Sequence, residues 1–149
     1  MRLTSILSRF FSDGKESRNL IQILNQNLKS EESLRTRYIR QAQGIRSPQV
    51  ATKLLELAQR EAEHTAPLEE WIRKLGQEPD RQIEPAQPPA WTLGEILVQD
   101  YEEERRLYEA YLRQAKLIKN EELRALFQKM AEEAKKHLQE LTDLYARYS

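Results

Sequence analysis

The sequence contains no cysteine among its 149 residues. Disulfide bonds, thiolate nucleophiles, zinc–thiolate sites and iron centres with sulfur ligands are therefore excluded. A metal ion bound by this chain must be held by oxygen and nitrogen ligands.

The sequence also lacks an excess of charge of either sign, since 24 basic residues balance 24 acidic ones. Nucleic-acid binding normally needs a net basic face, so the balance argues against a nucleic-acid partner. No apolar run approaches the roughly 20 residues that span a bilayer, and the mean hydropathy is -0.80. We therefore expect one small cytoplasmic domain that can bury a core without disulfides.

The second half of the sequence resembles the first half at a constant offset of 73 residues, without insertion or deletion. Residues 38–42 read Tyr-Ile-Arg-Gln-Ala, and residues 111–115 read Tyr-Leu-Arg-Gln-Ala. The only two histidines, His64 and His137, have the same separation. We interpret this pattern as the internal duplication of a helical hairpin.

Four long segments have the apolar periodicity of α-helices, each roughly 40 Å in length. Capping signals mark their ends, such as a Ser-Pro pair, a Thr-x-x-Glu box and a glycine, Gly44, which we expect to end the first helix in a left-handed conformation. The predicted helices run from Lys15 to Gln43, from Ser47 to about Gly76, from Thr92 to about Lys119, and from Asn120 nearly to the C terminus.

The connections between these helices predict the topology. Only a few residues separate the helices within each half, so each pair must fold back as an antiparallel hairpin. Residues 77–91 contain four prolines and can extend about 50 Å, enough to cross the length of the bundle. We predict an all-α four-helix bundle formed by hairpin 15–76, crossover 77–91 and hairpin 92–149. Two independent hairpins are disfavoured, because neither could bury its apolar face alone.

Residues 1–14 precede the repeat and form a short amphipathic segment. Its five large apolar residues fall on one helical face. We interpret it as a helix that covers one end of the bundle or contacts another subunit. Docking of residues 1–12 to a membrane surface or to a partner protein is the alternative.

Acidic and imidazole side chains recur at matched heights along the bundle. Glu61 and His64 are one helical turn apart, and so lie on one face. Glu31 precedes the first hairpin turn, and Glu61 and His64 follow it. All three lie about 20 to 26 Å from the end of the bundle at which this turn is made. Glu104 and His137 repeat this arrangement about the second turn. The sequence therefore predicts three carboxylates and two imidazoles in one interior layer.

Such a buried layer needs compensation for its charge, because each uncompensated ion costs several kcal/mol. A pair of divalent metal ions is the usual solution inside a helical bundle. Oxygen and nitrogen ligands suit iron or manganese, and zinc or cobalt could also bind. The alternative is a protonated glutamate–histidine hydrogen-bond network without metal.

From about residue 15 to residue 148 the chain resembles the ferritin-like superfamily, in particular bacterioferritin and rubrerythrin-type diiron carboxylate proteins. The resemblance implies that Glu31 and Glu104 are terminal carboxylates, that Glu61 bridges two metals, and that His64 and His137 are terminal imidazoles. It also implies non-haem iron and oxidation of Fe(II) by dioxygen or peroxide, as in ferroxidases and peroxidases. The motifs that carry it are Ser30-Glu31 with Tyr38, Arg60-Glu61-Ala62-Glu63-His64, Leu75-Gly76-Gln77-Glu78-Pro79, and Glu104 with Tyr111.

Two positions depart from the pattern of bacterioferritins. Ala62 stands where those proteins carry a haem-ligating methionine, so we expect no haem. Ala134 stands where the family has its second bridging glutamate, which leaves three carboxylates for two metals. Water or an exogenous anion could fill the gap, Glu133 could substitute, or a single metal could bind.

The loss of that glutamate also leaves other functions open. The chain could be a degenerate scaffold with little or no metal that acts as a dimeric interaction protein, and we expect a homodimer in either case. A membrane-associated quinone hydroxylase of the same superfamily is a third interpretation, based on residues 1–12. Tyr38 and Tyr111 lie one to two turns beyond Glu31 and Glu104, where we expect each hydroxyl to bond a carboxylate across the bundle. A redox role is the alternative for these tyrosines.

Overall fold

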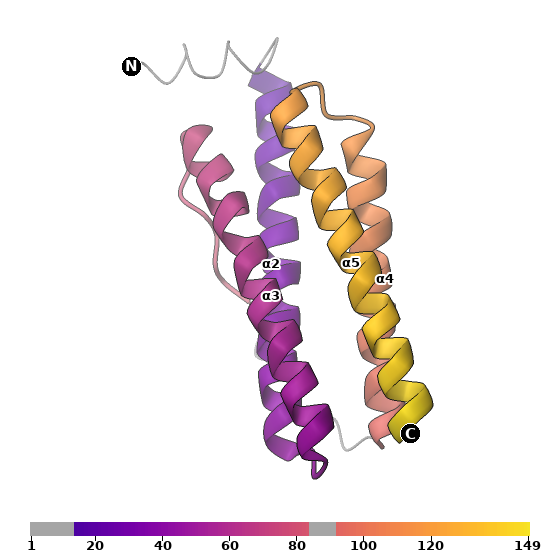
Figure 1. Cartoon of the computed structure of the whole chain (residues 1–149). Helices are drawn as coiled ribbons and strands as arrows, with labels where there is room; N and C mark the ends of the chain where they lie inside the picture. The colour runs from indigo at the N-terminus through magenta and orange to yellow at the C-terminus, as the bar shows by residue number, and fades with distance from the viewer. Residues whose placement is uncertain (1–13, 84–91) are drawn as a thin grey trace.

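The computed structural model describes residues 14–83 and 92–149, and all its regular structure is helical over those ranges. The predicted amphipathic segment therefore lies outside the described residues, except for Gly14, as does the last part of the predicted crossover. Figure 1 shows the four helices as a bundle. They are α2 (Gly14–Gly44), α3 (Pro48–Lys74), α4 (Leu93–Ala115) and α5 (Glu121–Tyr148).

Three of the helices begin at the predicted caps. The side chains of Ser47 and Asn120 each accept a hydrogen bond from a backbone N–H in the first turn of the helix that follows. Thr92 and Glu95 form both bonds of a capping box at the start of α4. These bonds satisfy N–H groups that have no partner within the helix, so the starts of α3, α4 and α5 are determined locally.

The prediction for Gly44 is wrong, because α2 includes this residue in right-handed helix. Among the described residues only Gly76 has a positive φ, of 90°. Its N–H bonds the carbonyl of Arg73 at 2.9 Å, and the N–H of Gln77 bonds the carbonyl of Ile72 at 3.2 Å. This pair of bonds is the Schellman motif, which uses a left-handed residue to end a helix. The left-handed glycine therefore ends α3.

The helices pair as two antiparallel hairpins, α2 with α3 and α4 with α5. Residues 45–47 join the first pair, and residues 116–120 join the second. The second connection is longer than expected because α4 ends at Ala115 instead of continuing to about Lys119.

The crossover between the hairpins starts back along the bundle after Gly76. The N–H of Asp80 bonds Asn25 Oδ1 at 2.9 Å, and its carboxylate lies 2.8 Å from Lys29 Nζ. Arg81 pairs with Glu69 on α3. These contacts hold the start of the crossover against α2 and α3. The predicted fold class, two hairpins joined by a long crossover in a ferritin-like bundle, is confirmed.

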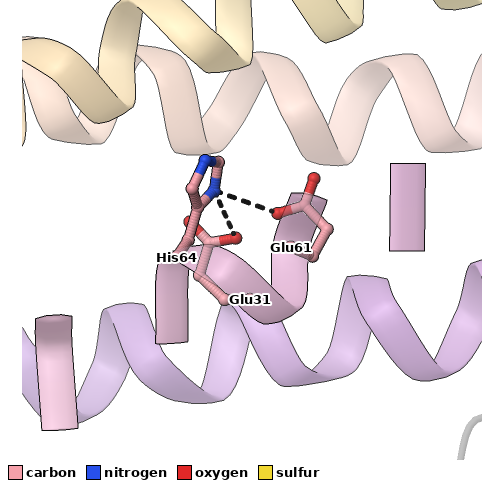
Figure 2. Close-up of side chains that lie close together, drawn as sticks. All are labelled: Glu31, Glu61 and His64. Atoms are coloured by element: carbon pink, nitrogen blue, oxygen red, sulfur yellow. Dashed lines mark hydrogen bonds and ion pairs between the residues drawn. The ribbon is translucent and has the colours of Figure 1, made fainter. Parts of the chain in front are cut away.

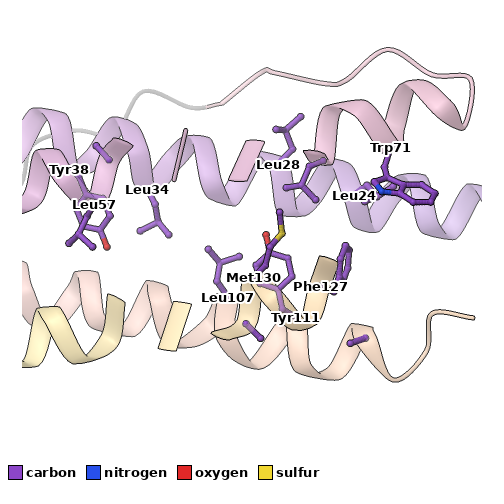
Figure 3. Close-up of a cluster of buried hydrophobic side chains, with 14 of the residues drawn as sticks. Leu24, Leu28, Leu34, Tyr38, Leu57, Trp71, Leu107, Tyr111, Phe127 and Met130 are labelled. Carbon is purple, nitrogen blue, oxygen red and sulfur yellow. The ribbon is translucent and has the colours of Figure 1, made fainter. Parts of the chain in front are cut away.

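All four helices contribute side chains to an apolar core that runs along the bundle (Figure 3). Its largest fully buried members include Tyr38, Tyr111 and Phe127. Burial of each large apolar side chain contributes roughly 1.5 to 3 kcal/mol of stability. None of the helices in the described ranges combines the length and the apolarity that a bilayer span requires. The core encloses the polar layer described next.

Candidate metal centre

The structure brings the five predicted metal-site residues together in the bundle interior. Glu31 comes from α2, Glu61 and His64 from α3, Glu104 from α4, and His137 from α5. None of the five is more than 6% exposed. The constant rise of an α-helix explains why distances counted along the sequence place these residues at one height.

The five side chains form two groups that share one carboxylate. Site 1 consists of Glu31, Glu61 and His64, and site 2 consists of Glu61, Glu104 and His137. Within each site the ligand atoms all lie within 4.8 Å of one another. In site 1, His64 Nδ1 is 3.3 Å from Glu31 Oε2 and 3.6 Å from Glu61 Oε2 (Figure 2). In site 2, His137 Nδ1 is 2.9 Å from Glu61 Oε1 and 3.3 Å from Glu104 Oε1.

Two tyrosines link the sites across the hairpins. Tyr38 on α2 donates a hydrogen bond to Glu104 Oε1 at 2.8 Å, and Tyr111 on α4 donates one to Glu31 Oε1 at 2.7 Å. Burial and the neighbouring carboxylate charges raise the pKa of both phenols well above the ordinary value. Both hydroxyls therefore remain protonated donors at physiological pH. Each tyrosine therefore holds in position a carboxylate that belongs to the other hairpin.

Burial and mutual interactions shift the pKa values of the three ionisable groups in site 1. Burial and the negative charges of Glu31 and Glu104 raise the pKa of Glu61 well above its usual range. Burial opposes ionisation of Glu31, but hydrogen bonds with Glu61 and His64 outweigh it and lower the pKa. Burial also disfavours the His64 cation, yet Glu31 and Glu133 raise the pKa of His64 to about 9. A bound cation would displace these protons, as metals generally do from their ligands.

One buried oxygen in the layer lacks a hydrogen-bond partner, as expected of an atom that a cation would contact. Glu61 Oε1 accepts no hydrogen bond, although His137 Nδ1 is only 2.9 Å away. A buried polar atom without a partner costs about 1–3 kcal/mol. A cation held by Glu61 and His137 would remove that cost. The donor set of carboxylate oxygens and imidazole nitrogens suits iron or manganese.

Glu133 lies outside both sites in this structure. Its Oε2 contacts His64 Nε2, whereas Glu31 and Glu61 face the other ring nitrogen, Nδ1. Ala134, where the family pattern has a glutamate, is 3% exposed and presents only a methyl group. Glu133, the candidate substitute ligand, therefore contacts the ring nitrogen of His64 that does not face site 1.

A second buried polar cluster was not found by sequence reasoning. Asp100 is fully buried and accepts a hydrogen bond from Gln41 Nε2 at 2.9 Å, with Arg37 Nη1 4.0 Å away. Burial is the main cause that raises the pKa of Asp100 to about 7. In the other half, Asn27 donates to Gln114 Oε1 at 2.8 Å. The sequence repeat relates the two pairs, because Asn27 and Gln41 in the first half correspond to Asp100 and Gln114 in the second, 73 residues later.

A bundle of two helical hairpins that encloses three carboxylates and two imidazoles in one layer defines the ferritin-like class. The sequence profile of the Rubrerythrin family matches residues 22–99, a little over half of the chain. The chain therefore belongs to the rubrerythrin family. No curated protein sequence matches the chain.

Solved structures of the same class share the fold at low sequence identity. Bacterioferritin of Desulfovibrio desulfuricans, described with a diiron site, is 23% identical, with a TM-score of 0.81, 89% of this chain covered and 81% of that chain. The dodecameric bacterioferritin-related thioferritin of Bacteroides fragilis is 19% identical, with a TM-score of 0.79 and coverages of 95% and 89%. A ferritin-like diiron-carboxylate protein of Bacillus anthracis is 22% identical, with a TM-score of 0.79 and coverages of 89% and 99%.

Proposed function

We propose that this protein binds non-haem iron at sites 1 and 2 and oxidises Fe(II) with dioxygen or peroxide. The observation that supports the proposal most strongly is the position of Glu61, whose two oxygens face His64 and His137. A carboxylate shared by two ligand groups is the arrangement that holds two metal ions close together. Manganese or zinc could use the same ligands.

Each site would hold one metal ion with its own residues and with the shared Glu61. Glu31 and His64 would hold one ion, Glu104 and His137 the other, and Glu61 would bridge them. Iron bound there would supply one electron per ion. Two Fe(II) ions would thus provide the two electrons that, with uptake of two protons, convert hydrogen peroxide to two waters or dioxygen to hydrogen peroxide.

Partners and location remain part of the proposal. We propose a cytoplasmic homodimer, and the related protein of Bacteroides fragilis is described as a dodecamer. Haem is not included, because Ala62 offers no ligand atom; the structurally similar bacterioferritin of Rhodobacter capsulatus is described with haem iron.

Anaerobic loading with Fe(II), followed by metal analysis and stopped-flow oxidation, tests the proposal. Wild type should bind Fe(II) and oxidise it when the loaded protein is mixed with dioxygen or peroxide in the stopped-flow instrument. His64→Ala should lower both the metal content and the rate, while Lys135→Ala, on the exposed face of α5, should change neither. Absence of bound metal in wild type would refute the proposal.

Ala134 favours a second candidate function, a metal-poor scaffold that acts as a dimeric interaction protein. Two divalent cations would face only three glutamates, so one positive charge is left uncompensated unless an anion binds. This candidate predicts that wild type binds no metal under anaerobic loading yet remains dimeric in solution. The metal analysis above therefore separates the two functions.

A further inference from the structure

We propose that Glu133 is a positioning residue for His64: it accepts the Nε2–H bond and thereby presents Nδ1 to site 1. The inference rests on the proposed metal-binding function. It assigns Glu133 a different task from the bridging role that its neighbour Ala134 leaves open.

The two nitrogens of His64 face different surroundings. Nδ1 faces inward, 3.3 Å from Glu31 Oε2 and 3.6 Å from Glu61 Oε2, while Nε2 meets Glu133 Oε2. An imidazole that binds a metal through Nδ1 must carry its proton on Nε2. Glu133 is placed to accept that proton's hydrogen bond, which fixes both the tautomer and the ring plane. A carboxylate in this position also makes the histidine a more basic ligand.

The corresponding residue of the other half has the opposite charge. Arg60 precedes Glu133 by 73 residues, and its guanidinium binds Glu140 at 2.6 and 2.8 Å. Arg60 and Glu133 line the same cavity of about 490 Å³ beside His137. The contacts of His137 with site 2 are made through Nδ1, to Glu61 and Glu104. The two imidazoles are therefore not equivalent, and within residues 14–83 and 92–149 only His64 meets a carboxylate through Nε2.

This difference predicts an order of filling. Site 1 has a histidine that is oriented and made more basic by Glu133, whereas site 2 has an arginine near the corresponding position. We therefore expect site 1 to bind a divalent cation more tightly than site 2. The carboxylate of Glu133 sets this preference without contacting the metal.

Anaerobic titration with Co(II) distinguishes positioning from direct ligation, because the visible spectrum of Co(II) reports its coordination. Removal of a partner of this kind typically weakens metal affinity 10- to 100-fold. Glu133→Ala should weaken the tighter site by about that factor, with two ions still bound and an unchanged spectrum. Glu133→Gln should lose less, since its amide oxygen can still accept the bond. Glu132→Gln, an exposed neighbour with the same charge change, should match wild type.

The hydrogen bond itself can be measured without metal. In ¹⁵N-edited NMR spectra of the metal-free protein, the Nε2–H of His64 should exchange slowly in wild type and in Glu133→Gln, and rapidly in Glu133→Ala. Loss of one Co(II) ion or a changed spectrum in Glu133→Ala would show that Glu133 is a direct ligand and overturn the proposal, as would an unchanged affinity. A wild type that binds no Co(II) would refute the proposed function instead, and the NMR result would still judge the contact.

Discussion

The hydroxyl of Tyr38 on the first hairpin donates a hydrogen bond of 2.8 Å to Glu104 Oε1 on the second, and both residues are buried inside the bundle. Tyr111 makes the reciprocal bond to Glu31 at 2.7 Å. Asn27–Gln114 and Gln41–Asp100 also join α2 to α4, and the two tyrosine bonds connect the hairpins at the level of the candidate metal centre. The acceptors of these bonds are Glu104 of site 2 and Glu31 of site 1.

Removal of either hydroxyl should destabilise the metal-free protein. Tyr38→Phe and Tyr111→Phe each leave a buried carboxylate oxygen with one donor fewer, at a cost of about 1–3 kcal/mol. The two losses should be similar, because the surroundings of the two bonds match. Urea denaturation gives the free energy of unfolding. Tyr145→Phe, which alters an exposed hydroxyl, should leave that free energy within about 0.5 kcal/mol of wild type. If all three variants had the unfolding free energy of wild type, the two buried bonds would not contribute to stability.

Substitution of the shared carboxylate should affect both sites at once. Glu61→Gln removes a negative ligand from site 1 and site 2, so both ions should bind at least 10-fold more weakly. Glu31→Gln should weaken mainly the ion at site 1, and Glu104→Gln mainly the ion at site 2. Calorimetric titration with Zn(II) resolves the two affinities. If Glu61→Gln weakened only one ion, Glu61 would not be a bridge.

The pH dependence of stability should report Asp100. Its pKa is about 7 in the folded protein and has an ordinary value of 3.8, so the folded state retains a proton that the unfolded state releases between those values. The contribution to stability is therefore present below about pH 4, decreases as the pH rises, and is lost above pH 7. The slope is up to about 1.4 kcal/mol per pH unit. The charged groups around Asp100 are Arg37, Glu103 and Glu104.

Asp100→Asn should flatten the curve of unfolding free energy between pH 4 and pH 7, measured by denaturation at constant ionic strength. The other half of the bundle offers a matched control. Asn27→Asp places a carboxylate beside Gln114, as Asp100 stands beside Gln41, and should make the slope steeper. Parallel curves for wild type and Asp100→Asn would show that Asp100 does not titrate in this range.

Local and periodic features were predictable from the sequence. The caps at Ser47, Thr92 and Asn120 depend on residues one turn away, so sequence neighbours are sufficient to identify them. The heights of Glu31 and Glu104 follow from the fixed rise of a helix, once the short turns establish that the helices are antiparallel. Fold class and the gathering of the five side chains needed no further information.

The remaining features depend on tertiary contacts. Glu133 is at the edge of the inward face of α5, where a long side chain can turn to either side, and the position of His64 decides which. Asp100 belongs to no local motif, and its burial beside Gln41 appears only when α2 and α4 are packed. Gly44 is the last residue of α2, whereas Gly76 lies beyond the end of α3, and of the two only Gly76 has a positive φ.

Restoration of the missing glutamate should have opposite effects on the metal-free and the metal-bound protein. Ala134 is buried one turn before His137, 73 residues after Glu61. In the metal-free protein, Ala134→Glu adds a fourth carboxylate beside Glu61, whose pKa is already raised by its neighbours. Overpacking and the extra charge should together cost about 1–3 kcal/mol of unfolding free energy.

With metal bound, the same glutamate supplies the ligand and the negative charge that two divalent cations lack. Thermal unfolding with and without Zn(II) should therefore show a larger metal-induced rise in Tm for Ala134→Glu than for wild type. Ala134→Gln is the matched control, because it has the same size without the charge: it should lose stability in the metal-free protein and gain no more from Zn(II) than wild type does. Equal gains for glutamate and glutamine would mean that position 134 does not face the metals. A gain in Ala134→Glu with none at all in wild type would identify the natural protein as the metal-poor scaffold, with Ala134 as the residue that prevents metal binding.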